Sequence, residues 1–183
     1  MPVRLLYQNE LYDVDVRKEI IIMSATQMTR PAATAADSAA NTHMTAALSA
    51  WGFLALRLAV GAVFAMHGWQ KLTVMGVGGV AGFFGSLGIP FPEVAALVVT
   101  LVELVGGLAL ILGLGTRLAG ALLAVDMLVA LILVHLPNGF AVENGGYEFV
   151  LVLLAASLFF ALSGPGRISL DARLFARRLP HLA

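Results

Sequence analysis

The chain has 183 residues, of which 60% are hydrophobic and only 12% are charged, and its formal net charge is zero. Soluble domains average about 45–50% apolar and about 25% charged residues, so this chain carries too much apolar surface to bury in a globule and is predicted to lie in a membrane. A zero net charge gives no global attraction for nucleic acid, and the absence of cysteine excludes disulfides, thiolate-bound iron–sulfur clusters and c-type haem attachment.

The first 50 residues are predicted to form a cytoplasmic tail. Residues 25–50 are rich in alanine, threonine and serine, which is typical of disordered or loosely helical segments. The apolar patch EIIIM at 19–23 is too short for the core of a signal peptide. The membrane domain is expected over residues 51–166, followed by a basic cytoplasmic tail over 167–183.

Four apolar stretches are long enough to be candidate membrane helices. They lie at 51–72, 94–115, 118–136 and 147–163, close to the ~20 residues that cross about 30 Å of hydrocarbon at 1.5 Å per residue. The stretch 73–93 is too short and too rich in glycine to span, so an interfacial or re-entrant segment is predicted there. The expected fold class is therefore all-α, an integral membrane four-helix bundle with this short segment between helices 1 and 2.

The distribution of lysine and arginine predicts that both ends of the chain face the cytoplasm. Basic residues gather in the two tails and, at Arg117, in the turn between the second and third helices. The loop between the third and fourth helices contains Glu143 and no basic residue. Because cytoplasmic flanks are enriched in lysine and arginine, this pattern orients the four helices consistently.

Three ionisable residues lie inside the predicted helices, where an isolated charge is costly and often marks function. They are Arg57, Glu103 and Asp126, at depths of roughly 9, 15 and 12 Å from the cytoplasmic side at 1.5 Å per residue. These similar depths predict a structural ion-pair network. Two alternatives stay open, because Arg57 can extend to the interface and the acids can serve only to hold helices together. A carboxyl left without a partner is a candidate proton carrier.

A second polar group gathers towards the outer end of the predicted bundle. His67 and Lys71 are spaced i, i+4 and share a helix face, and Glu148 opens the fourth helix, where its charge also suits the helix N-terminus. His135 follows Asp126 by nine residues, about 180° around an ideal helix, so both face inward only if the helix is distorted. Haem ligation by His67 and His135 is a less favoured hypothesis, and no metal site is predicted.

The order and spacing of these motifs resemble the DoxX family of small four-helix membrane proteins, over about residues 52–170. The resemblance rests on LRLAVGAVFAMHGWQKL (56–72), GVAGFFGSLGIP (79–90), LVELVGGLALILGLGTRLAG (101–120) and NGGYEFVLVLL (144–154). Five residues match polar positions of the family, namely Arg57, His67, Lys71, Glu103 and Glu148. Asp126 and His135 match the family pattern less closely.

The resemblance implies a quinone- or redox-linked membrane subunit of oxidative or sulfur metabolism in the bacterial cytoplasmic (inner) membrane. Relatives include the membrane subunit of a thiosulfate:quinone oxidoreductase, so partner subunits or further copies of the chain are expected. Quinone would bind near the outer helix ends, where the candidates for quinone contact or proton transfer are His67, Lys71, Glu103 and Glu148.

Two other classes of function stay open. The chain could be a non-enzymatic membrane anchor or scaffold for soluble redox partners, with its buried charges serving helix assembly. It could also be a small proton or solute transporter, because buried acids are common proton relays in membranes. The sequence contains no P-loop, dinucleotide fingerprint, HExxH or serine-nucleophile motif.

Overall fold

The computed structural model describes residues 16–25 and 35–175. These ranges are helical, with connecting turns and no strand. The chain divides into two compact units, Met1–Ala46 and Ala47–Ala183. In the first unit, 16–25 and the chain from residue 35 onward are helical, and the rest of the predicted tail lies outside the described residues. The second unit contains all of the candidate site residues.

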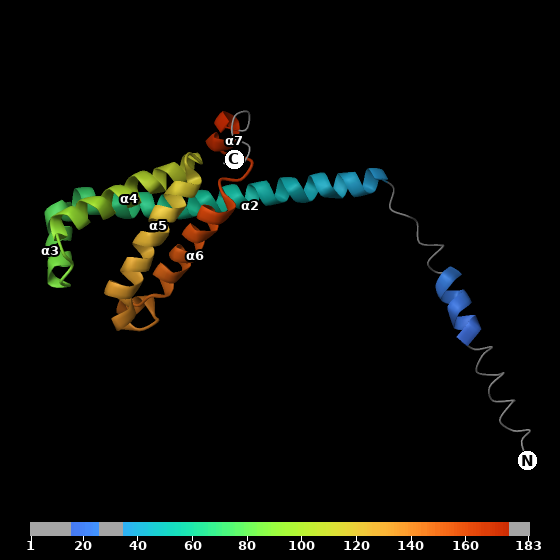
Figure 1. Cartoon of the computed structure of the whole chain (residues 1–183), viewed down its shortest axis with the longest axis horizontal. Coiled ribbons are helices and arrows are strands. Elements are labelled where there is room, and N and C mark those ends of the chain that lie inside the picture. The colour runs from blue at the N-terminus through green and yellow to red at the C-terminus, as the bar shows by residue number, and fades with distance from the viewer. Residues whose placement is uncertain (1–15, 26–34, 176–183) are drawn as a thin grey trace, which may run out of the picture. The chain divides into compact units, whose positions relative to one another are not determined.

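From residue 35 onward, helices follow one another with short connections (Figure 1). In chain order they are α2 (Ala35–Gln70), the π-helix η1 (Lys71–Met75), α3 (Gly76–Ser86), α4 (Pro92–Leu112), α5 (Thr116–Ala130), the π-helix η2 (Leu131–His135), the 3₁₀ turns η3 (Leu136–Asn138) and η4 (Val142–Asn144), α6 (Glu148–Ser163) and α7 (Leu170–Phe175).

Within the described residues, three helical stretches are long and apolar enough to cross a membrane: Thr42–Ser86, Pro92–Leu112 and Thr116–Asn138. The fourth predicted span corresponds to α6, which is apolar but has only 16 residues. At 1.5 Å per residue this gives about 24 Å, less than the ~30 Å of an average hydrocarbon core. The part of the chain that the structure describes is therefore all-helical, with three candidate membrane spans and one shorter apolar helix.

Glycine allows α2 and α4 to approach closely. A Cβ atom added to Gly61 would lie 2.8 Å from the Gly107 carbonyl oxygen, and one added to Gly68 would lie 2.7 Å from the Cα atom of Leu104. Small residues at such crossings permit backbone contact, which favours helix association in lipid. The order of these contacts shows that the two helices run antiparallel, with Gly68 level with Leu104 and Gly61 level with Gly107.

One apolar core connects α2, α4, α5 and α6. Its buried residues are Val60, Phe64, Leu110, Ala119, Leu123, Met127, Val150, Leu153 and Phe160. At the α5–α6 crossing, a Cβ atom on Gly120 would lie 2.8 Å from the Ser157 carbonyl oxygen. This close contact is therefore possible because glycine has no side chain. The helices that carry the candidate site residues are thus held in close register.

The glycine-rich segment after α2 forms the short helix α3. Gly76 adopts φ 67°, a conformation that favours glycine, and this residue ends the continuous run of α2 and η1. Val80 and Ala81 of α3 pack against Ala96 of α4 in a second apolar cluster. Figure 1 shows α3 beside the start of α4. Its interfacial or re-entrant placement remains a prediction.

Candidate functional site: a half-buried lysine with two acids

A half-buried ion pair joins η1, which directly follows α2, to the middle of α4. Lys71 Nζ donates a hydrogen bond of 2.5 Å to Glu103 Oε2. The Lys71 side chain is 20% exposed and the Glu103 side chain only 5%. The antiparallel register explains the pair, because the contact of Gly68 with Leu104 places the two backbones side by side at this level. Lys71 and Glu103 were both predicted site residues, but an ion pair between them was not predicted.

Asp126 on α5 completes this site. Its Oδ2 atom is buried and has no hydrogen-bond partner among the described residues. The charges of Glu103 and Lys71 both act on this carboxyl group electrostatically. We call Lys71, Glu103 and Asp126 the acid–lysine cluster. With Lys71 charged, the cluster is neutral when its two carboxyl groups hold one proton between them, and neutrality is favoured because an uncompensated charge is costly away from water.

Two π-helical segments lie beside the acid–lysine cluster. Lys71 is the first residue of η1, and η2 begins five residues after Asp126. Such single-turn π segments shift the face that a helix presents and often occur at functional sites. Asp126 and His135 can both face inward only if the helix between them is distorted, and η2 is such a distortion. His135 nevertheless bonds to the loop before α6, where its Nδ1 atom forms a hydrogen bond of 2.7 Å with the Gly145 carbonyl oxygen.

The other two outer candidates both have contacts at the start of α6, His67 from α2 and Glu148 as the first residue of α6. The His67 ring is exposed and lies 6.4 Å from the Phe149 ring, between centroids. Glu148 Oε1 accepts a hydrogen bond of 2.7 Å from the Val142 amide, and the Glu148 amide donates one of 3.0 Å to the Phe140 carbonyl oxygen. Glu148 therefore closes the loop that precedes α6. Its part in proton transfer remains a prediction.

Arg57 does not join Glu103 or Asp126, in contrast to the predicted network. Its Nη1 and Nη2 atoms donate to the carbonyl oxygens of Pro165 and Ile168, at 2.5 and 2.7 Å. The register gives the reason: Arg57 is fourteen residues before Lys71, about 21 Å along the helix, and lies level with Gly113. The similar depths of Arg57, Glu103 and Asp126 were counted from the predicted end of each helix, and such depths do not give the register between helices.

The segment after α6 makes contacts that the sequence analysis missed. Asp171 accepts hydrogen bonds from the amides of Gly115 and Thr116, at 2.8 and 3.0 Å, and so caps the N-terminus of α5. The Asp171 amide in turn donates to the Gly113 carbonyl oxygen at 2.9 Å. A possible signal was the Ser169-Leu-Asp sequence, since Ser169 Oγ accepts from the Ala172 amide and opens α7. Nothing in that sequence identified the α4–α5 turn as the partner.

Metal ligands do not gather in this part of the molecule. Over residues 16–25 and 35–175, no group of three or more His, Asp and Glu side chains could hold a metal ion. Haem ligation by His67 and His135 stays a less favoured hypothesis. Their surroundings differ, since His67 is exposed whereas His135 is half-buried and bonded to the loop.

Comparison with known proteins identifies similar chains. The DoxX family matches residues 52–136. A Bacillus subtilis protein named "Putative oxidoreductase CatD" is 38% identical over 124 residues, which cover 68% of this chain and 87% of that protein. "Uncharacterized membrane protein Rv3486" of Mycobacterium tuberculosis is 37% identical, with coverage of 68% and 82%. "Inner membrane protein YphA" of Escherichia coli is 32% identical, with coverage of 66% and 88%. No solved structure matches the chain.

Proposed function

Because the chain belongs to the DoxX family of membrane proteins, we propose that it is the membrane subunit of a quinone-linked redox system. The observation that carries the proposal is the acid–lysine cluster, in which a half-buried ion pair adjoins a buried carboxyl oxygen that has no hydrogen-bond partner among the described residues. The oxidoreductase name of the Bacillus subtilis relative supports a redox role.

Quinone reduction consumes two electrons and two protons at the carbonyl oxygens. The acid–lysine cluster can supply a proton, since it is neutral with one proton on its two carboxyl groups, and Lys71 is a donor that is partly exposed. His67 is an exposed second donor one helical turn before Lys71. The chain has no cysteine to hold an iron–sulfur centre, so the electrons would come from another bound cofactor or from a partner subunit.

The proposal includes a location and an orientation. We place the chain in the bacterial cytoplasmic membrane, with four crossings, α3 at the interface and both ends in the cytoplasm. Arginine at the α4–α5 turn and after α6, against an acidic loop before α6, supports this orientation. The acid–lysine cluster and His67 then lie towards the outer face.

Tryptophan fluorescence offers a direct test of quinone binding. The chain has two tryptophans, of which Trp69 is two residues from Lys71 and Trp51 is near the other end of the span. In lipid nanodiscs, Trp51→Phe leaves Trp69 as the only reporter, and Trp69→Phe leaves Trp51. A short-chain ubiquinone or menaquinone is expected to quench Trp69 saturably and Trp51 only in proportion to its concentration in the lipid.

Variants of the acid–lysine cluster test its role in the same assay. In the Trp51→Phe background, Glu103→Gln and Asp126→Asn should weaken the saturable quenching, and Glu143→Gln, in the exposed loop, should leave it unchanged. Absence of saturable quenching at Trp69 would refute the quinone site. If the cluster variants lost stability while quinone binding persisted, the ion pair would serve only to join α2 and α4, as the anchor hypothesis requires.

A further inference from the structure

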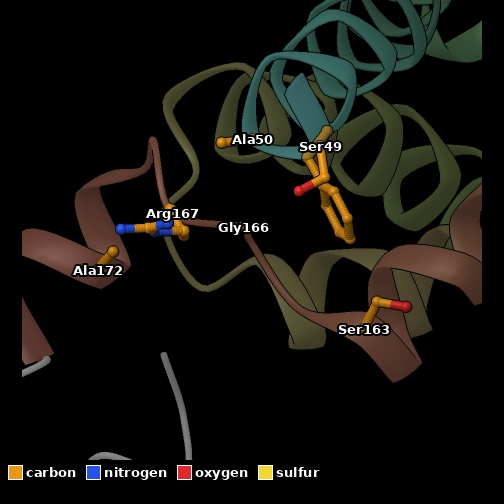
Figure 2. A pocket seen from close by; sticks show the side chains of 7 residues that line it. Ser49, Ala50, Ser163, Gly166, Arg167 and Ala172 are labelled. Atoms are coloured by element: carbon orange, nitrogen blue, oxygen red, sulfur yellow. The ribbon is translucent and has the colours of Figure 1, made fainter. Parts of the chain in front are cut away.

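A pocket lies beside residues 49–53 of α2, near the start of the first span, whereas the acid–lysine cluster lies just beyond the end of α2. Its volume is about 390 Å³, within the range of small-ligand sites, and it is lined by Ser49, Ala50, Phe53, Ser163, Gly166, Arg167 and Ala172. Figure 2 shows Arg167 beside Ala172 on one side of the hollow and Ser49 on the other. The pocket is thus formed where the first span meets the segment after α6.

A close contact between Gly166 and Phe53 forms part of the pocket wall. A Cβ atom on Gly166 would lie 3.0 Å from the Cβ atom of Phe53, so the segment after α6 passes directly against the first span. Arg57 holds this segment by its bonds to the carbonyls of Pro165 and Ile168, which flank Gly166 and Arg167. The pocket wall is therefore fixed by hydrogen bonds on both sides of Arg167.

The charge around the pocket is positive. Arg167 is exposed and has no hydrogen bond or ion pair within the described part of the chain. Arg57 is 2% exposed and bonds to carbonyl oxygens, while Arg117 Nη1 donates to the Leu162 carbonyl oxygen at 2.7 Å. Asp171, which accepts hydrogen bonds from two amides, is the acid that these contacts bring to this side of the pocket. Arg57, Arg117, Arg167 and Asp171 together carry an excess of positive charge.

The pocket also lies where phospholipid headgroups are expected. Ser163 is the last residue of α6, and Trp51, which follows the lining residue Ala50, is 63% exposed. Exposed tryptophan at the end of a span is typical of the interface between hydrocarbon and headgroups. A ligand in the pocket would meet a guanidinium group, two serines and the apolar walls of Ala50, Phe53 and Ala172.

We propose that this pocket binds the headgroup of an anionic phospholipid. The phosphate pairs with the Arg167 guanidinium, since arginine matches phosphate oxygens with a charge-assisted fork. The glycerol and the first acyl carbons contact Phe53 and Ala50. The excess positive charge selects a lipid with net negative charge over a zwitterionic one. This assignment does not depend on the proposed quinone chemistry, which concerns the other end of the molecule.

Native mass spectrometry of the full chain tests the proposal. The protein is released from nanodiscs that contain equal amounts of phosphatidylglycerol and phosphatidylcholine with the same acyl chains. Wild-type protein should retain phosphatidylglycerol preferentially. Arg167→Gln should lower this retention about five-fold, the effect of one basic group at an anionic surface. The matched control is Arg173→Gln, an exposed arginine of α7 that does not line the pocket.

A second variant separates the pocket from general surface charge. Ala172→Phe fills the pocket without removing Arg167, so it should lower phosphatidylglycerol retention as well. Equal retention of the two lipids, or equal losses in Arg167→Gln and Arg173→Gln, would overturn the proposal. Displacement of the lipid by millimolar inorganic phosphate would identify a site for free phosphate and would also overturn it.

Discussion

Lys71 and Glu103 illustrate how strongly a single charge in this protein depends on its neighbour. The Glu103 side chain is 5% exposed, and its nearest cation is the Lys71 ammonium group. Lys71→Met leaves this carboxylate buried without a partner, and removal of one member of a buried pair costs about 3–5 kcal/mol. The free energy of unfolding, measured by SDS titration with circular dichroism, should fall by that amount.

A double variant provides the control for this prediction. Lys71→Met with Glu103→Leu removes both charges, and apolar replacement of a buried pair is often close to neutral. The double variant should therefore recover most of the lost stability. If it unfolds as readily as Lys71→Met alone, the loss arises from packing around Lys71 rather than from the uncompensated charge.

Asp171 is a second residue whose partners lie far away in sequence. Asp171→Ala removes both hydrogen bonds to the α5 N-terminus, and loss of such a cap costs about 0.5–2 kcal/mol. The segment after α6 should open more often, so trypsin should cleave the solubilised protein faster after Arg167 and Arg173. Glu143→Gln, in the exposed loop, should leave the cleavage rate unchanged. An unchanged rate in Asp171→Ala would show that the cap does not hold the segment.

At the scale of the helices, close contact between α2 and α4 positions the acid–lysine cluster. A Cβ atom on Gly68 would meet the backbone and the Cβ atom of Leu104, so Gly68→Ala must push the two helices apart. Overpacking of this kind costs about 1–3 kcal/mol. The same displacement lengthens the Lys71–Glu103 contact, so Gly68→Ala should reduce both the free energy of unfolding and the saturable quinone quenching.

Gly52 is the matched control for this helix. It also lies in α2, but a Cβ atom there would have no neighbour within 4 Å. Gly52→Ala should stabilise the protein by up to about 1 kcal/mol, because alanine loses less backbone entropy in a helix. A loss of stability in Gly52→Ala similar to that in Gly68→Ala would contradict the packing explanation.

At the scale of the whole molecule, the predicted four-crossing arrangement requires that α6 cross the membrane. Its 16 residues are fewer than a typical span, although its neighbours are three candidate spans. The chain has no cysteine, so single cysteines report the side on which each residue lies. We expect a membrane-impermeant maleimide to label Glu143→Cys in intact cells and Arg173→Cys only after permeabilisation. Labelling of both residues from one side would show that α6 does not span.

Much of the architecture followed from local sequence. The apolar runs predicted the helices that became α2, α4, α5 and α6, because backbone groups in lipid must be satisfied within the helix. The glycine-rich stretch forms the short helix α3, which lies within the first candidate span, Thr42–Ser86, so its separation from the spans stays a prediction. The two π-helical segments were not predicted, since single-turn distortions have no strong sequence pattern.

For the candidate site, too, the sequence determined one part and the tertiary structure another. Composition alone determined that this is a membrane protein, and the cost of charge in hydrocarbon singled out Arg57, Glu103 and Asp126 as residues that need partners. Only the tertiary structure decided those partners. The close register of α2 and α4 pairs Glu103 with Lys71, and the return of the chain after α6 supplies carbonyl groups to Arg57. Pairing depends on the relative position of helices, which is set by glycine contacts between segments far apart in the sequence.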